Sequence, residues 1–193
     1  MKLSPLLALA LALAIGNRAH AIELANDGWT PGAQAGVQSG FVVGEIAAAS
    51  LSGGCAAPTL QAVRLYFGGA TTQRAISLRI YDDSAGQTIP GALIFSDVFQ
   101  LTGNNTDLSE INLSANAQVL PSRFRVGVQF TQAGVPSVAG DADGTINASR
   151  NFVFTDIGGG PTWLQSQALG VTGDWIIRAE VSCSPAIFAN GFE

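Results

Sequence analysis

Hydrophobic and polar residues alternate with a period of two in four segments of this 193-residue chain, at positions 60–67, 75–82, 123–131 and 174–182. In each segment the apolar side chains share one face and the polar or charged side chains share the other. The apolar faces carry Val63, Leu65 and Phe67; Ile76, Leu78 and Ile80; Phe124, Val126, Val128 and Phe130; and Trp175, Ile177, Ala179 and Val181. This order is typical of antiparallel strands that pack one face against a core.

Four further apolar runs predict strands at 41–51, 92–101, 108–113 and 151–155. Glycine-rich turns separate the runs, and patterns with a helical period are nearly absent. Charged residues make up 12% of the chain, against about 25% in an average protein. About eight short strands in one domain predict an all-β fold, an antiparallel two-sheet β-sandwich with a jelly-roll-like topology.

Residues 1–21 have the three parts of a cleavable signal peptide. Lys2 supplies the positive charge, residues 6–15 form the apolar stretch, and Ala19-His20-Ala21 matches an A-x-A cleavage site. The apolar stretch is about half the length of a membrane span. We therefore predict cleavage after Ala21, a β-sandwich domain at 22–185, a C-terminal tail at 186–193, and a secreted product without stable membrane insertion.

Removal of residues 1–21 changes the chemistry available to the chain. The only methionine and the only histidine, Met1 and His20, are lost with it, and so are Lys2 and Arg18. Seven arginines then stand against 14 acidic residues, a net charge of −7 without any lysine. This composition excludes Ser-His-Asp and Cys-His catalysis, histidine-ligated zinc and lysine Schiff bases. An acidic chain without lysine is also not expected to bind nucleic acid.

Paired carboxylates are the remaining route to catalysis, as in glycoside hydrolysis. The glutamates inside the domain that we consider are Glu45, Glu110 and Glu180. Arg178 lies two residues from Glu180 and favours its ionised form, which is not the form of a general acid. No spacing marks an acid–base pair, so we expect no enzymatic activity.

Cys55 and Cys183 are the only two cysteines. An even number of cysteines in an exported protein predicts a disulfide bond between them. The alternative is a pair of buried free thiols.

Two acidic loops suggest calcium as a candidate cofactor. Asp141 and Asp143, followed by Gly144, resemble part of an EF-hand loop, but Arg150 stands where the loop needs a bidentate acid. We therefore expect no EF-hand and keep a looser calcium site as a hypothesis. Asp82 and Asp83 end a predicted strand and form the second candidate. The alternative for both loops is a solvated turn in which aspartate caps backbone amides.

Aromatic and arginine side chains suggest a sugar-binding face. Arg64 with Tyr66, and Arg79 with Tyr81, point outward from their predicted strands and form one patch if those strands are neighbours. Trp163 follows a Gly-Pro turn and is predicted at a loop tip. Exposed aromatic rings stack on sugars. The alternative is that arginine pairs with acidic residues and that tyrosine covers apolar edges.

Two stretches carry a family resemblance. Residues 81–94, with the motif Ile89-Pro90-Gly91-Ala92-Leu93, and residues 173–179 (GDWIIRA) resemble a bacterial exported β-sandwich module. The segment 136–138, Asp141 and Trp163 follow in the same order, so the resemblance covers nearly the whole mature chain. It implies an accessory or adhesion-like role within secreted or surface proteins, and it supplies no catalytic residues.

Residues 187–193 (IFANGFE) are similar to a tail that ends many exported proteins of Gram-negative bacteria. Such a terminus can enter a partner's groove or add to a sheet edge, or it can dock on its own domain. Two hypotheses follow. The chain is a non-enzymatic exported β-sandwich that binds a glycan or another cell-surface ligand. Alternatively, it is a structural or assembly protein of the cell envelope, whose tail is recognised by an export or sorting partner.

Overall fold

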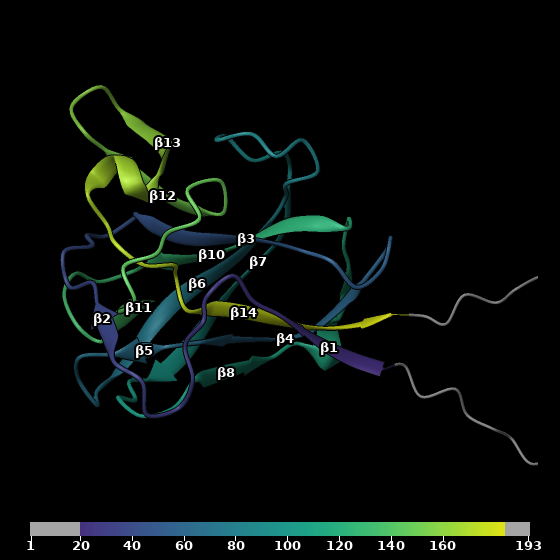
Figure 1. The fold of residues 1–193 in the computed structure, drawn as a ribbon, viewed down its shortest axis with the longest axis horizontal. Coiled ribbons are helices and arrows are strands. Elements are labelled where there is room, and N and C mark those ends of the chain that lie inside the picture. The colour runs from purple at the N-terminus through teal and green to yellow at the C-terminus, as the bar shows by residue number, and fades with distance from the viewer. Residues whose placement is uncertain (1–19, 184–193) are drawn as a thin grey trace, which may run out of the picture.

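The computed structural model describes residues 20–183 and is built from β-strands (Figure 1). The strands are β1 (His20–Leu24), β2 (Ala35–Val37), β3 (Ile46–Ser52), β4 (Thr59–Leu65), β5 (Phe67–Gly68), β6 (Gln73–Asp82), β7 (Leu93–Thr102), β8 (Ser109–Asn112), β9 (Gln118–Val119), β10 (Arg123–Phe130), β11 (Ser137–Asp141), β12 (Asn151–Asp156), β13 (Pro161–Gln165) and β14 (Ile177–Cys183). Two short 3-10 turns, η1 (Ser114–Asn116) and η2 (Ser166–Leu169), are the helical elements of this range. Most of the predicted signal peptide and the whole tail lie outside the described residues.

Two large antiparallel sheets pack as a sandwich (Figure 1). The six-stranded sheet has the order β13-β12-β3-β10-β6-β7. The five-stranded sheet has the order β1-β14-β4-β8, and β9 also pairs with β4. A small third sheet, β2-β11-β5, completes the fold. The predicted all-β sandwich is therefore confirmed.

The four alternating segments form the centre of the core, as predicted. Leu65 of β4, Leu78 of β6, Val126 of β10 and Ile177 of β14 belong to one buried apolar cluster. β4 and β14 come from one sheet and β6 and β10 from the other, so the alternation brings the two sheets together on their apolar faces. Each such side chain contributes about 1.5–3 kcal/mol when fully buried.

The hairpin of β12 and β13 corrects the prediction for Trp163. This residue lies within β13, opposite Phe154 of β12, and not at a loop tip. The loop is the segment before it, where Asp156 accepts hydrogen bonds from the backbone N–H groups of Gly158 and Gly160. The Gly-Pro sequence predicted the turn correctly, but strand β13 already begins at Pro161, so Trp163 lies inside the strand.

β1 begins two residues before the predicted start of the mature domain. His20 and Ala21 pair with Cys183 and Ser182 at the end of β14. Cleavage after Ala21 would leave a strand that begins at Ile22, whose pairing with Val181 is unaffected.

Cys55 and Cys183 form the predicted disulfide bond, with their Cα atoms 6.0 Å apart and a sequence separation of 128. Disulfide bonds form in oxidising compartments, so this bond indicates an extracytoplasmic environment. Within residues 20–183, neither helical turn has the length and apolar character needed to cross a membrane.

Candidate functional site

The predicted sugar-binding patch is not formed. Arg64 belongs to β4 in the five-stranded sheet, and Tyr66 follows that strand directly, whereas Arg79 and Tyr81 belong to β6 in the six-stranded sheet. The two pairs therefore cannot lie side by side on one face. The side chain of Arg79 is half-buried, and its Nε has no hydrogen-bond acceptor within residues 20–183.

The three aromatic residues of the predicted patch are buried. Tyr66 packs edge-on against Trp29 and donates its hydroxyl to the backbone oxygen of Asn105. Tyr81 packs edge-on against Trp163, with ring centres 5.5 Å apart, and Trp163 is only 9% exposed. Tyr81 and Trp163 belong to a smaller apolar cluster of the six-stranded sheet, and Tyr66 belongs to another with Trp29, Ala139 and Ile176. They are not available as stacking platforms.

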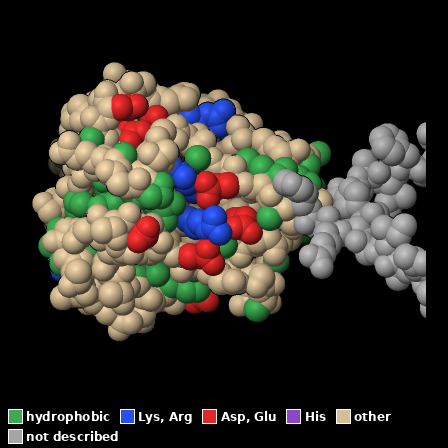
Figure 2. Space-filling view, turned by 60° about the horizontal axis from the view of Figure 1, so that its bottom comes forward, with side chains coloured by type: hydrophobic (Ala, Val, Ile, Leu, Met, Phe, Trp, Pro, Cys, Tyr) green, Lys and Arg blue, Asp and Glu red, His purple; other side chains and the backbone are tan. Residues whose placement is uncertain are grey.

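Arg64 is part of an ion-pair network on the outer face of the five-stranded sheet. Its guanidinium lies 3.1 Å from Glu23, 2.9 Å from Glu110 and 2.8 Å from Glu180. In Figure 2, basic side chains (blue) lie among acidic side chains (red) on the face that is shown. The hydrogen bond that Arg64 donates to Glu110, with further contributions from Glu23 and Glu180, raises the pKa of Arg64. Arginine here pairs with acids, which was the alternative to a sugar contact.

Asp82 and Asp83 point to different environments. The carboxylate of Asp83 is buried, 2.8 Å from Arg125 Nη2 and 3.1 Å from Arg123 Nε. Asp82 closes an exposed turn, where it accepts hydrogen bonds from the N–H and the hydroxyl of Ser84. These two bonds lower the pKa of Asp82. The second candidate calcium loop therefore consists of a carboxylate bound by two arginines, Asp83, and a carboxylate that caps a turn, Asp82.

Asp141 and Asp143 also accept hydrogen bonds from backbone N–H groups. Asp141 accepts from Gly28 N at 3.1 Å and from Asp174 N at 2.8 Å, which ties the N-terminal segment to the approach of β14. Asp143 is exposed and accepts from Thr145 N at 2.8 Å. In the part of the chain that the structure describes, no group of three or more His, Cys, Asp or Glu side chains is placed to hold a metal ion.

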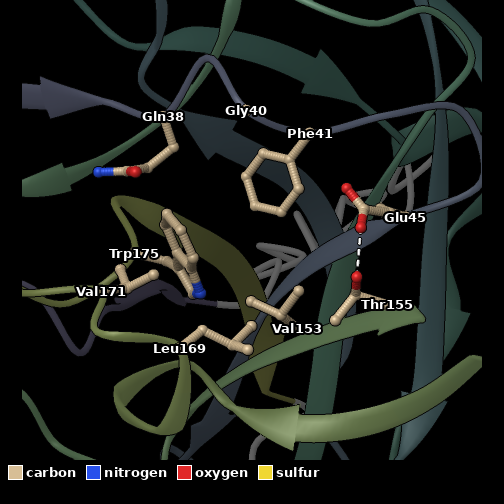
Figure 3. Close-up of a pocket in the computed structure, with 9 residues that line it drawn as sticks. All are labelled: Gln38, Gly40, Phe41, Glu45, Val153, Thr155, Leu169, Val171 and Trp175. Atoms are coloured by element: carbon tan, nitrogen blue, oxygen red, sulfur yellow. Dashed lines mark hydrogen bonds between the residues drawn. The ribbon is translucent and has the colours of Figure 1, made fainter. Parts of the chain in front are cut away.

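A cleft at one end of the sandwich is the candidate site that the structure itself presents (Figure 3). Its volume is about 280 Å³. It lies between the segment that joins β2 to β3, strand β12, and the chain from η2 to β14. Its lining consists of Gln38, Gly40, Phe41, Glu45, Val153, Thr155, Leu169, Val171 and Trp175.

The floor of this end cleft is aromatic. The Phe41 ring stacks on Phe130 with centres 4.4 Å apart, and the centre of the Trp175 ring lies 5.8 Å from that of Phe41. Trp175 donates its indole N–H to the backbone oxygen of Phe152 at 3.2 Å. Phe41 is 8% exposed and Trp175 is 0% exposed, so both rings are packed in the core and give the cleft an apolar base rather than a stacking surface.

One wall of the end cleft is polar. Glu45 accepts a hydrogen bond from the hydroxyl of Thr155 through Oε1 and another from Val42 N through Oε2, the latter at 2.8 Å. The backbone N–H of Glu45 donates a hydrogen bond to the backbone oxygen of Val42 at 3.2 Å, which closes a tight turn. Gly44 lies in this turn with a φ of +92°. These contacts fix the carboxylate, and each of its oxygens keeps a further lone pair for a ligand.

A second hollow, of about 390 Å³, lies on the other side of the Glu45–Thr155 pair. Val42 and Val43 line it and are more than half exposed, and Pro161 lines it from β13. Leu169, in the wall of the first hollow, is also exposed. Apolar rims around a fixed carboxylate suit a ligand with both apolar and hydrogen-bonding surface.

Sequence reasoning considered Glu45 only as a catalytic acid and did not single out Phe41 or Thr155. The available signal was the run Phe41-Val42-Val43, three apolar residues that precede a glycine and lie outside the alternating pattern. Comparison with known protein families, curated proteins and solved structures gives no match to this chain.

Proposed function

We propose that the chain is a non-enzymatic, exported, carbohydrate-binding β-sandwich whose ligand site is the end cleft. In this proposal residues 1–21 direct export and are removed, and the strands follow a jelly-roll-like path. The observation that carries the proposal is the pairing of an apolar wall, Leu169 and Val171, with a fixed hydrogen-bonding wall, Glu45 and Thr155.

Sugars match this combination of surfaces. A pyranose ring has an apolar face of C–H groups, which packs on apolar side chains, and hydroxyls at its edge that donate hydrogen bonds. The free lone pairs of Glu45 accept such bonds. Ligand clefts usually measure about 300–1,000 Å³, so the end cleft, at about 280 Å³, suits one sugar residue or the end of a chain.

A binding role is favoured over catalysis by the positions of the glutamates. Glu45 accepts hydrogen bonds from Val42 N and from the Thr155 hydroxyl. Glu110 and Glu180 both contact Arg64 on the opposite sheet, away from the end cleft. A glycosidase needs two carboxyl groups that flank one bond, and neither Glu110 nor Glu180 lines the end cleft beside Glu45.

A glycan array followed by calorimetry tests the proposal with two matched variants. Leu169→Arg places a long cation at the exposed wall of the end cleft, whereas Val119→Arg makes a similar change at an exposed site on β9. We expect the wild type and Val119→Arg to bind the same neutral glycan, and Leu169→Arg to lose at least about tenfold in affinity, roughly 1.4 kcal/mol. A folded wild type that binds no glycan would overturn the sugar ligand, and full binding by Leu169→Arg would overturn the site.

The same array also tests the calcium hypothesis. One copy is probed with calcium present and a second copy with a chelator. Glycan binding that disappears in the chelator supports a calcium cofactor, and equal binding on both copies removes it from the proposal.

A further inference from the structure

Three arginines and a single buried carboxylate form a cluster at the end of β10 where Arg123 lies. Arg125 and Arg123 each contact Asp83, at 2.8 and 3.1 Å. Arg150 lies beside them, where it donates to Ser52 Oγ at 2.8 Å. Three guanidinium groups and one carboxylate leave a net charge of +2 in a domain whose total charge is negative.

The single carboxylate is fully used. Asp83 Oδ1 accepts from Arg125, and Oδ2 accepts from both Arg123 and the hydroxyl of Ser50. Arg150 has no carboxylate partner within residues 20–183. Its positive charge is therefore not neutralised by the protein.

Arg123 and Arg150 are close neighbours. Arg123 Nε donates to Ser50 Oγ at 3.0 Å, and Arg150 Nη1 lies 3.5 Å from the backbone oxygen of the same residue. Arg123 also reaches the backbone oxygen of Ser149, the residue before Arg150. Burial, with repulsion from Arg123 in second place, lowers the pKa of Arg150. Both side chains remain partly open to solvent.

We propose that Arg123 and Arg150 form a binding site for an oxyanion, a sulfate or phosphate group held between their guanidinium groups. Guanidinium groups bind tetrahedral oxyanions through paired N–H donors. An anion placed here relieves the repulsion between the two cations, and the partial burial of both side chains strengthens the attraction relative to open water. The ligand is either a free inorganic anion or the same group carried on a polysaccharide.

Thermal unfolding and calorimetry with sodium sulfate test this site, with sodium chloride at equal ionic strength as the reference. Arg150→Gln removes one of the two cations. Arg74→Gln is the matched control, because Arg74 is half-buried, donates only to the backbone oxygen of Ala133, and contacts no carboxylate in the described part of the chain. Arg150→Lys keeps the positive charge but loses the paired N–H donors of the guanidinium group. This variant replaces Arg150→Gln in the test if the glutamine variant does not fold.

We expect sulfate to raise the unfolding temperature of the wild type and of Arg74→Gln more than chloride does. Affinity for sulfate should fall roughly tenfold or more in Arg150→Gln, as the loss of a charge-assisted hydrogen bond implies, and by a smaller factor in Arg150→Lys. Equal sulfate and chloride effects in the wild type, or unchanged affinity in the Arg150 variants, would overturn the proposal.

A second titration distinguishes the two sources of the anion. The probes are a sulfated dextran oligosaccharide and the unsulfated oligosaccharide of the same length. Tighter binding of the sulfated chain than of inorganic sulfate, lost in Arg150→Gln, supports a site for a sulfated glycan. Equal affinity for both supports a site for the free anion. Binding of the sulfated chain that Arg150→Gln leaves unchanged would argue against the site.

Discussion

The buried ion pair between Asp83 and Arg125 provides the sharpest test of how this fold is stabilised. The side chain of Arg125 is 0% exposed and that of Asp83 is 1% exposed. Arg125 also donates to the backbone oxygens of Gln87 and Thr88, and its guanidinium carbon lies 3.5 Å from the centre of the Phe152 ring. Burial lowers the pKa of Arg125, and the carboxylate of Asp83 opposes that shift.

Asp83→Asn removes the only negative charge in contact with this guanidinium among the described residues. A buried charge that loses its partner costs about 3–5 kcal/mol of folding free energy. The matched control is Asp82→Asn, one residue earlier, where the side chain closes an exposed turn with Ser84. That change should cost less than about 1 kcal/mol, as exposed interactions usually do.

Urea denaturation with the disulfide intact measures both variants, and the midpoint gives the difference in unfolding free energy. A double variant, Asp83→Asn with Arg125→Met, removes both charges and should recover part of the loss, because no unpaired charge then stays buried. Equal midpoints for Asp83→Asn and Asp82→Asn would refute the assignment of Asp83 to a buried structural pair.

Three further predictions follow from other parts of the fold. Replacing Cys55 and Cys183 by serine should lower the unfolding free energy by about 5 kcal/mol, because the bond joins residues with a sequence separation of 128. Calorimetry measures this loss, and a change below about 1 kcal/mol would contradict the prediction. Burial raises the pKa of Asp174 above 3.8, so the folded state binds this proton more tightly than the unfolded chain does. Ionised Asp174 therefore lowers the folding stability at neutral pH, and this loss of stability should decrease as the pH falls through the raised pKa towards 3.8. Asp174→Asn should be relatively more stable at pH 7 than at about pH 4, as urea midpoints at both pH values will show, and a pH-independent difference would contradict the sign. On the exposed edge strand β7, Asp97 accepts the N–H of Val98 at 2.7 Å, and Val98 is 58% exposed. Asp97→Val frees this donor and adds apolar surface, so light scattering should detect concentration-dependent association, and an unchanged particle size would count against edge protection.

The alternating pattern predicted the central strands well because it depends on local geometry alone. Consecutive side chains of a strand point to opposite faces, so Ile76, Leu78 and Ile80 share a face wherever β6 lies in the fold. The short strands β2, β9 and β11 were missed, and β1 and β13 with them. Their runs are too short or too close to glycine and proline for alternation to mark them, and they form because neighbouring strands offer backbone partners.

The candidate site depended far more on tertiary structure. Arg64 and Arg79 looked alike in sequence, but one joins three glutamates and the other lies half-buried on the opposite sheet. Asp82 and Asp83 are adjacent in sequence, yet only Asp83 meets arginine. Such differences arise from strands that are distant in sequence, and no local pattern encodes which of them become neighbours.

The sequence by itself determined the all-β class, the apolar faces of the core strands and the cysteine pairing. Each of these follows from residue type together with the period of a strand or from a count of residues. The tertiary structure decided that the tyrosines and Trp163 are buried, that Arg123 and Arg125 share one buried carboxylate, and that Phe41, Glu45, Thr155 and Trp175 line one cleft. The physical reason is that burial and charge pairing depend on the sheet that each strand joins and on the segments that cover its outer face, and these are settled by long-range contacts.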